Sequence, residues 1–154
     1  GKIFPAAPFG REAFTFFKHL SNAGLIEGQY SGNSLSMCDA AACPTLRAGG
    51  LWYVQDFGKI SPSGFCLGCF SGEYDNSFLL ITKTGGYNLL TPQDVWNIDT
   101  KMDDGRPATG KMAVQAAGLS LANCTDTALS TNMAANYLLT SEVKNCTFYL
   151  RQQF

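Results

Sequence analysis

Six cysteines carry the most reactive side chains of this sequence, and their spacing is the first guide to their chemistry. An even number of cysteines in a chain of 154 residues is typical of a protein that is cross-linked in an oxidising compartment. Six cysteines allow fifteen pairings, and spacing alone does not select among them. The simplest prediction pairs near neighbours, as Cys38 with Cys43, Cys66 with Cys69, and Cys124 with Cys146.

Two other uses of the cysteines require free thiolates. Cys66 and Cys69 form a C-x-x-C motif, which is a redox couple when the first thiol lies at a helix N-terminus that lowers its pKa. Cys38 and Cys43 can also join this motif as four zinc ligands, although the spacing of this pair is loose for such a site. Gly and Ser residues surround the C-x-x-C motif and indicate a loop, so structural disulfides are the favoured interpretation.

Three aspartates near the end of an expected helix form the second candidate site. Asp99 and Asp103 are four residues apart and lie on one helix face, where like charges repel. Asp103 and Asp104 also lie near the helix C-terminus, where the helix dipole disfavours anions. The favoured compensation is hydrogen bonding to backbone amides of residues 105–110, with help from a basic neighbour such as Arg106. Calcium is the alternative, because it prefers carboxylate and carbonyl oxygens, although the spacing is not that of an EF-hand.

Catalytic candidates are few. His19 is the one histidine in the sequence, so every triad or dyad that needs an imidazole must use it. It lies within an expected helix, where a structural role is the favoured interpretation, and paired cysteines leave no thiol nucleophile for it. We therefore expect that the protein is not an enzyme and needs no cofactor, calcium excepted.

Binding surfaces can instead come from aromatic residues. Trp52, Tyr53 and Tyr74 can form a contact surface that stacks on sugars, although aromatic residues in strands belong more often to the core. The eleven Lys and Arg residues nearly balance the twelve Asp and Glu residues, and they form no basic cluster. Neither nucleic acid nor an anionic membrane surface therefore has a docking site of the usual kind.

Length and composition predict a single domain over residues 1–154. The chain is 45% hydrophobic, which is enough for one core, and only 15% charged, so uncharged polar residues and glycine must cover much of its surface. Such a surface favours lateral packing over repulsion. The sequence has no apolar run near the ~18 residues of a membrane helix. Because it begins with Gly1, we expect a processed piece whose export signal lies elsewhere.

The first half of the chain predicts one helix and several strands. Apolar residues at i, i+3, i+4 and i+7 predict a helix over residues 11–22, with Gly24 as its left-handed cap. Surface loops are predicted over residues 29–50 and 58–76, which contain the first two cysteine pairs. The elements between and after them are a strand over 51–57 and a hairpin of strands 78–83 and 87–90 that turns at residues 84–86.

The second half begins with a well-marked helix start. Thr91 is a capping residue, Pro92 suits the first helical position and Asp94 completes a capping box, so a helix is predicted from Pro92 to near Gly105. Residues 112–121 are apolar without clear period, and residues 128–139 can hold a helical turn or two. Residues 146–154 alternate like a final strand. Together these elements predict an α+β fold.

Two stretches resemble the globular region of the bacterial type IV pilin-like family. Family members contain a helix of the form HL..AGLI.G.Y, followed later by an element of the form ID.K.DDG.P..G. This sequence matches the first pattern from His19 to Tyr30 and the second from Ile98 to Gly110. Cys124 and Cys146 are also similar to the pair that closes the terminal loop of many pilins.

This resemblance implies a pilin-like head, in which an antiparallel sheet packs against helices and disulfides staple the loops. It implies that Asp99, Asp103, Asp104 and Gly105 fix the exit of the second helix, around calcium in the alternative interpretation. The implied function is structural, as a subunit of a type IV pilus or a related pseudopilus, with other pilin or pseudopilin subunits or a surface or host target as partners. The implied location is extracytoplasmic, first anchored in the inner membrane and then periplasmic or on the cell surface.

The long apolar N-terminal helix that anchors such subunits is not part of this sequence, and the resemblance implies that it has been removed. The alternative function is a secreted module that binds glycan or protein outside any fibre. The upstream sequence separates the two hypotheses. A short basic leader followed by ~20 retained apolar residues supports a pilin, whereas a conventional cleaved signal supports the secreted module.

Overall fold

An antiparallel sheet of four strands is the centre of the computed structural model, which describes residues 11–33, 38–47, 49–61, 66–82 and 86–151. The strand order in this sheet is β1 (Gly50–Asp56), β4 (Asn76–Thr82), β6 (Cys146–Arg151) and β5 (Met112–Ala116). Strands β2 (Lys59–Ile60) and β3 (Gly72–Glu73) form a small second sheet. The other elements are helices α1 (Arg11–Asn22) and α2 (Pro92–Met102) and the 3₁₀ turns η1 (Ala117–Leu119) and η2 (Leu121–Asn123).

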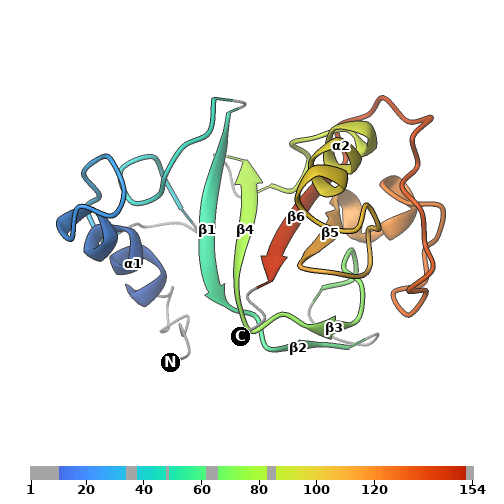
Figure 1. Ribbon diagram of the computed structural model, residues 1–154, viewed down its shortest axis with the longest axis horizontal. Coiled ribbons are helices and arrows are strands. Elements are labelled where there is room, and N and C mark those ends of the chain that lie inside the picture. The colour runs from blue at the N-terminus through green and yellow to red at the C-terminus, as the bar shows by residue number, and fades with distance from the viewer. Residues whose placement is uncertain (1–10, 34–37, 48, 62–65, 83–85, 152–154) are drawn as a thin grey trace.

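The two helices pack at opposite ends of the central sheet (Figure 1). Helix α1 lies beside β1, where Phe14 and Phe17 join the core around Tyr53. Helix α2 lies near β5 and β6, and its Val95 joins a second group of buried residues that includes Val114 and Phe148. This arrangement confirms the predicted α+β class, with an antiparallel sheet, helices and disulfide-closed loops.

Helix α1 has the bounds that the apolar period predicts. It ends in a Schellman motif, in which the Leu25 amide donates to the Leu20 carbonyl at 2.9 Å and the Gly24 amide donates to the Ser21 carbonyl at 3.0 Å. Gly24 has a φ of +69°, the left-handed conformation that this motif requires. The predicted cap is therefore confirmed.

Helix α2 begins as predicted and ends slightly earlier than predicted. The Thr91 hydroxyl accepts from the Asp94 amide at 3.1 Å, and the Asp94 carboxylate accepts from the Thr91 amide at 3.1 Å, which completes the capping box. The helix ends at Met102, because Asp103 has left the helical conformation although its amide still donates to the Asp99 carbonyl.

The predicted hairpin is wrong. Strand β4 pairs with β1 over seven residues and with β6 from Ser77 to Leu79, and no ladder among the described residues joins it to residues 87–90. That segment makes only an isolated bridge, between Leu90 and Cys146. Residues 84 and 85 of the expected turn lie outside the described residues. The pattern identified an extended segment at β4 correctly but did not show which neighbour it would pair with.

Two further segments differ from their predictions. Residues 128–139 form turns and no helix. The expected loop over 58–76 contains the short pair β2 and β3. The weakly periodic stretch after residue 112 forms β5, and all five of its residues are buried, which explains why they show no alternation.

All three predicted disulfides are present. The Cα atoms are 6.0 Å apart in Cys38–Cys43, 5.4 Å in Cys66–Cys69 and 5.6 Å in Cys124–Cys146. All six cysteines are therefore paired. Within the part of the chain that the structure describes, no helix has the length and apolar content needed to cross a membrane.

Candidate functional site

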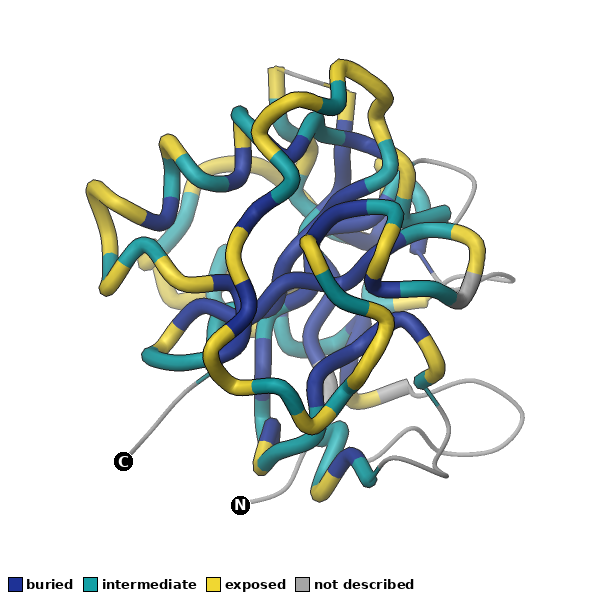
Figure 2. Tube along the Cα trace, turned by 90° about the vertical axis from the view of Figure 1, so that its right-hand side faces the viewer, coloured by how far each residue is buried: buried dark blue, intermediate teal, exposed yellow. Residues whose placement is uncertain are grey.

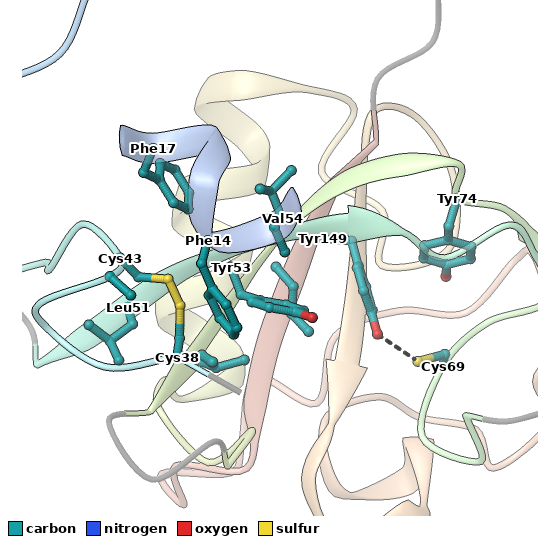
Figure 3. Close-up of a cluster of buried hydrophobic side chains, with 14 of the residues drawn as sticks. Phe14, Phe17, Cys38, Cys43, Leu51, Tyr53, Val54, Cys69, Tyr74 and Tyr149 are labelled. Atoms are coloured by element: carbon teal, nitrogen blue, oxygen red, sulfur yellow. Dashed lines mark hydrogen bonds between the residues drawn. A yellow bond between two sulfur atoms is a disulfide. The ribbon is translucent and has the colours of Figure 1, made fainter. Parts of the chain in front are cut away.

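The aromatic residues predicted to form a contact surface lie mostly inside the molecule (Figure 3). Tyr53 and Tyr74 are buried, and Tyr74 packs edge-on against Tyr149 with ring centroids 4.8 Å apart. The prediction of an exposed surface is wrong for these two residues, because the pleat of the sheet and the turn before β4 direct both rings into the core. Trp52 alone is half-buried and reaches the surface.

The other reactive candidates do not come together into a site. His19 lies on an exposed face of α1. Cys66 and Cys69 are joined in a turn, and no helix begins at Cys66, so the feature that would lower the pKa of its thiol is missing. Because each of the four cysteines considered for zinc is bonded to its near neighbour, the zinc alternative has no thiolate ligands.

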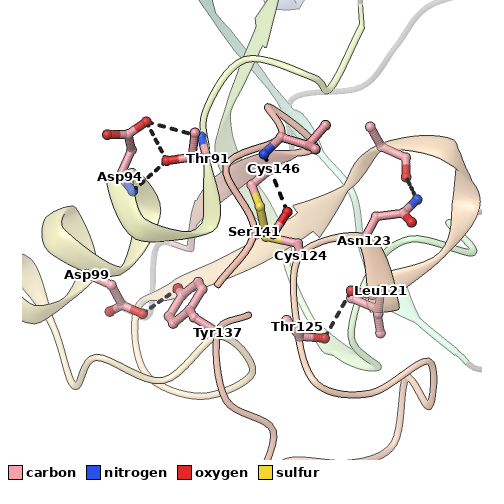
Figure 4. The surroundings of a disulfide bond; sticks show 12 residues. Thr91, Asp94, Asp99, Leu121, Asn123, Cys124, Thr125, Tyr137, Ser141 and Cys146 are labelled. Carbon is pink, nitrogen blue, oxygen red and sulfur yellow. Dashed lines mark hydrogen bonds between the residues drawn. A yellow bond between two sulfur atoms is a disulfide. The ribbon is translucent and has the colours of Figure 1, made fainter. Parts of the chain in front are cut away.

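The segment closed by Cys124 and Cys146, here called the closed loop, is the best-built surface feature (Figure 4). It leaves the 3₁₀ turn η2, crosses the end of the molecule near α2 and returns to the sheet at β6. Its ends are held within the fold, because the Ala117 amide donates to the Asn145 carbonyl at 2.7 Å and the Leu138 amide donates to the Cys124 carbonyl at 3.0 Å.

Hydrogen bonds inside the closed loop give it a fixed shape without regular secondary structure. Thr125 and Tyr137 form an antiparallel bridge. Asp126 accepts from both the backbone amide and the side-chain amide of Asn136, each at 3.0 Å. These bonds favour the charged carboxylate and lower the pKa of Asp126.

One buried hydrogen bond ties the closed loop to α2. The Tyr137 hydroxyl donates to the Asp99 carboxylate at 2.6 Å (Figure 4). Both residues are buried, and this burial raises the pKa of Asp99 to about 6, against the opposing effect of the bonds from Tyr137 and Gly105. Burial, followed by the bond to Asp99, raises the pKa of Tyr137.

The three aspartates at the end of α2 come together as the spacing predicts. One carboxylate oxygen from each lies within 4.8 Å of the others. Backbone and hydroxyl donors from the following turn point at them, which is the favoured compensation from sequence. The Gly105 amide donates to Asp99 at 3.2 Å, the Arg106 amide donates to Asp104 at 2.9 Å and the Met112 amide donates to Asp103 at 2.8 Å. The Thr109 hydroxyl donates to Asp104 at 2.5 Å.

The turn after α2 also depends on a glycine. Gly110 has a φ of +71°, and a Cβ there would lie 2.0 Å from the Asp103 carboxylate. Its carbonyl accepts a hydrogen bond from the Arg151 guanidinium at the end of β6. The acidic turn is therefore fixed to the sheet, as well as to the closed loop through Asp99.

The closed loop exposes large apolar side chains among polar and charged ones. Only three of its 23 residues are charged. Most of the large exposed hydrophobic side chains among the described residues belong to it, namely Leu129, Met133, Leu139 and Val143. Figure 2 views this side of the molecule and shows exposed stretches of chain running over the buried core. Exposed apolar side chains concentrated on one rigid segment mark an interaction surface.

Sequence reasoning missed two parts of this arrangement. Tyr137 was not singled out, because its partner Asp99 lies 38 residues away and no local pattern links the two. The apolar residues of the loop suggested helical turns, whereas their exposure shows that they do not form the buried face of a helix.

Comparisons with known proteins add no relative of this chain. No protein-family model matches it, and no curated protein or solved structure matches it either. The argument about function therefore rests on the residues and the geometry.

Proposed function

We propose that this chain is the globular head of a type IV pilin-like subunit, belonging to a pilus or a related pseudopilus, and that its role is assembly and surface contact. The observation that carries this proposal is the closed loop, which has a fixed shape and exposes four large apolar side chains. A disulfide, a buried hydrogen bond and an internal bridge hold it in one shape. A preorganised apolar surface loses little conformational entropy when it docks on a neighbouring subunit.

The proposed partners are further copies of this subunit or related subunits, and the proposed location is outside the cytoplasm, where disulfides persist. A target on another surface is the alternative partner for the same loop. We propose no catalytic role, since His19 and the acidic turn provide no nucleophile paired with a base.

The closed loop provides a direct test in the bacterium that carries the full-length gene. Leu129 is 66% exposed and Val143 is 59% exposed, so replacing either with aspartate should leave folding intact. We expect Leu129→Asp and Val143→Asp to reduce fibres recovered by shearing by about tenfold, because each substitution buries a charge at the subunit contact. The amount of subunit in the cell envelope should not change.

Leu67→Asp is the matched control, because Leu67 is 54% exposed and lies outside the closed loop. Fibre yields from both loop variants equal to that of the control would overturn the proposal. Recovery of wild-type protein as a monomer in the medium, with no fibre at all, would instead support the secreted binding module.

A further inference from the structure

An apolar cavity of about 430 Å³ lies between α1, the segment that follows it and the central sheet. Four aromatic residues from four different segments line it: Phe17, Tyr30, Trp52 and Phe78. Its size is in the range of sites that hold small molecules. The lining comes from α1, the segment after it and strands β1, β4 and β6, and none of its residues belongs to the closed loop.

The aromatic rings meet one another at steep angles. Trp52 and Phe78 are perpendicular within a few degrees, at 87° and 6.5 Å between centroids, while Phe17 and Tyr30 are tilted at 51° and 6.1 Å apart. The face of an aromatic ring carries partial negative charge and attracts cations, most strongly in tryptophan.

The charge at the cavity has one sign. Among the described residues that line it, Glu27 is the single charged one, and no lysine, arginine or histidine belongs to that group. Glu27 lies at the exposed rim, next to the apolar interior. A purely apolar guest gains nothing from a carboxylate at this place, whereas a guest with a positive charge gains an attractive partner as well as the ring faces.

We propose that this cavity binds a small organic cation with apolar substituents, of the quaternary ammonium class. The alkyl groups of such a cation remove apolar surface from water, and its diffuse charge needs no hydrogen-bond acceptor inside the cavity. A primary amine fits less well, because its ammonium donors would lose water without finding acceptors among apolar walls.

The rim that carries Glu27 is fixed by local structure. The Tyr30 hydroxyl donates to the Glu27 carbonyl at 3.1 Å, so the ring folds back over the turn between them. Gly28 makes this possible, because it has a φ of +106° and a Cβ there would lie 3.0 Å from the Tyr30 hydroxyl oxygen. The Tyr30 ring and the backbone that carries Glu27 are thereby held in place before a ligand arrives.

The test compares choline with 3,3-dimethylbutan-1-ol, which has the same shape and no charge. Each is titrated into the protein while NMR follows the two tryptophan indole signals. We expect choline to bind about tenfold more tightly than the neutral alcohol and to move the Trp52 signal but not that of Trp96, which lies on α2. Equal affinities for the two compounds, or no binding of choline, would overturn the proposal.

Glu27→Gln should weaken choline binding about fivefold and leave the affinity for the neutral alcohol unchanged, because the substitution removes the charge and keeps the shape. The matched control is Glu73→Gln, an exposed glutamate in β3 that lies outside both the cavity and the closed loop, which should have no effect. Choline affinity unchanged in Glu27→Gln would contradict the role of the carboxylate. Fibre assembly should be the same in both variants, so this test and that of the closed loop fail independently.

Discussion

The disulfide-closed turns near Cys38 and Cys66 lie along the two outer strands of the sheet, whereas the closed loop extends away from the strands. Just after the first turn, the Pro44 carbonyl accepts from the Trp52 amide of β1 at 3.0 Å. In the second turn, the Gly68 carbonyl accepts from the Ala116 amide of β5 at 2.8 Å. Both outer strands therefore have partners at their edges, which blocks the strand-to-strand association that free edges allow.

The closed loop differs in what it presents. Several of its backbone groups bond within the loop or at its two ends, and four of its exposed side chains are large and apolar. Two of the disulfide-closed segments thus pair backbone groups at the edges of the sheet. The third presents exposed apolar side chains. From this comparison we expect any association between copies of this chain to occur through side chains on the closed loop and not through added strands.

The largest effect should follow removal of the long cross-link. Replacing Cys124 and Cys146 with alanine opens a loop whose ends are 22 residues apart in sequence. This change should reduce the free energy of unfolding by about 3 kcal/mol. The same change at Cys66 and Cys69 opens a loop whose ends are 3 residues apart and should reduce the free energy of unfolding by about 2 kcal/mol. Urea unfolding of both variants checks the order, and a greater loss for the short turn would show that it does more than close a local chain.

The bond between Asp99 and Tyr137 should make stability depend on pH. Because the pKa of Asp99 is raised to about 6 in the folded protein, its carboxyl loses a proton more readily when unfolded. Its contribution is fully present only below about pH 3 and is lost as pH rises through 6, which lowers the free energy of unfolding by at most about 3 kcal/mol. Stability measured from pH 4 to 7 in EGTA should show this loss.

Asp99→Asn is the control for this pH dependence, since it cannot ionise and keeps an oxygen that accepts from the Gly105 amide. The difference between wild type and variant isolates Asp99 from Asp126, whose lowered pKa has the opposite effect on stability. If the free energy of unfolding changed with pH in the same way in both proteins, the pKa of Asp99 would not be raised, contrary to what its burial indicates.

A smaller effect should follow Gly68→Ala, which tests how closely the second turn covers β5. A Cβ at Gly68 would lie 2.4 Å from the Ala116 carbonyl oxygen, which is backbone and cannot move without shifting the strand. We expect a loss of about 2 kcal/mol and a gain in aggregation, because the turn must lift from the edge. Gly72→Ala is the control, since the nearest atom to its Cβ would be 3.4 Å away. Equal stability of the two variants would contradict the tight contact.

The sequence predicted local features far better than it predicted neighbours. Thr91 and Asp94 define a helix start within four residues, and Leu20 and Gly24 define a helix end within five, so both were predictable from short patterns. The disulfides were also predictable, because each joins the cysteines nearest in sequence. The partner of β4 was not, since strand pairing is decided by the total surface that distant segments bury together.

The candidate site was predictable only in part. The three aspartates share a helix end, so their proximity follows from helix geometry. Tyr137 lies 38 residues beyond Asp99, and no local rule places it there. Tyr53 and Tyr74 were predicted at a contact surface from their residue type alone. Tyr53 lies on the inward side of its strand and Tyr74 lies in a turn, and both rings are buried.

The smallest effect should come from removing calcium, which tests whether anything besides hydrogen bonds holds the acidic turn at the foot of the closed loop. Each of the three carboxylates already accepts from at least one donor, among them the amides of Gly105 and Met112. Because these donors offset the charge, we expect EGTA to leave the melting temperature unchanged to within about 1 °C. A drop that calcium reverses and magnesium does not, and that disappears in Asp103→Asn, would instead make the turn a calcium site. The closed loop would then be held through Asp99 by an ion as well as by Tyr137, and its rigidity would depend on the calcium concentration around the protein.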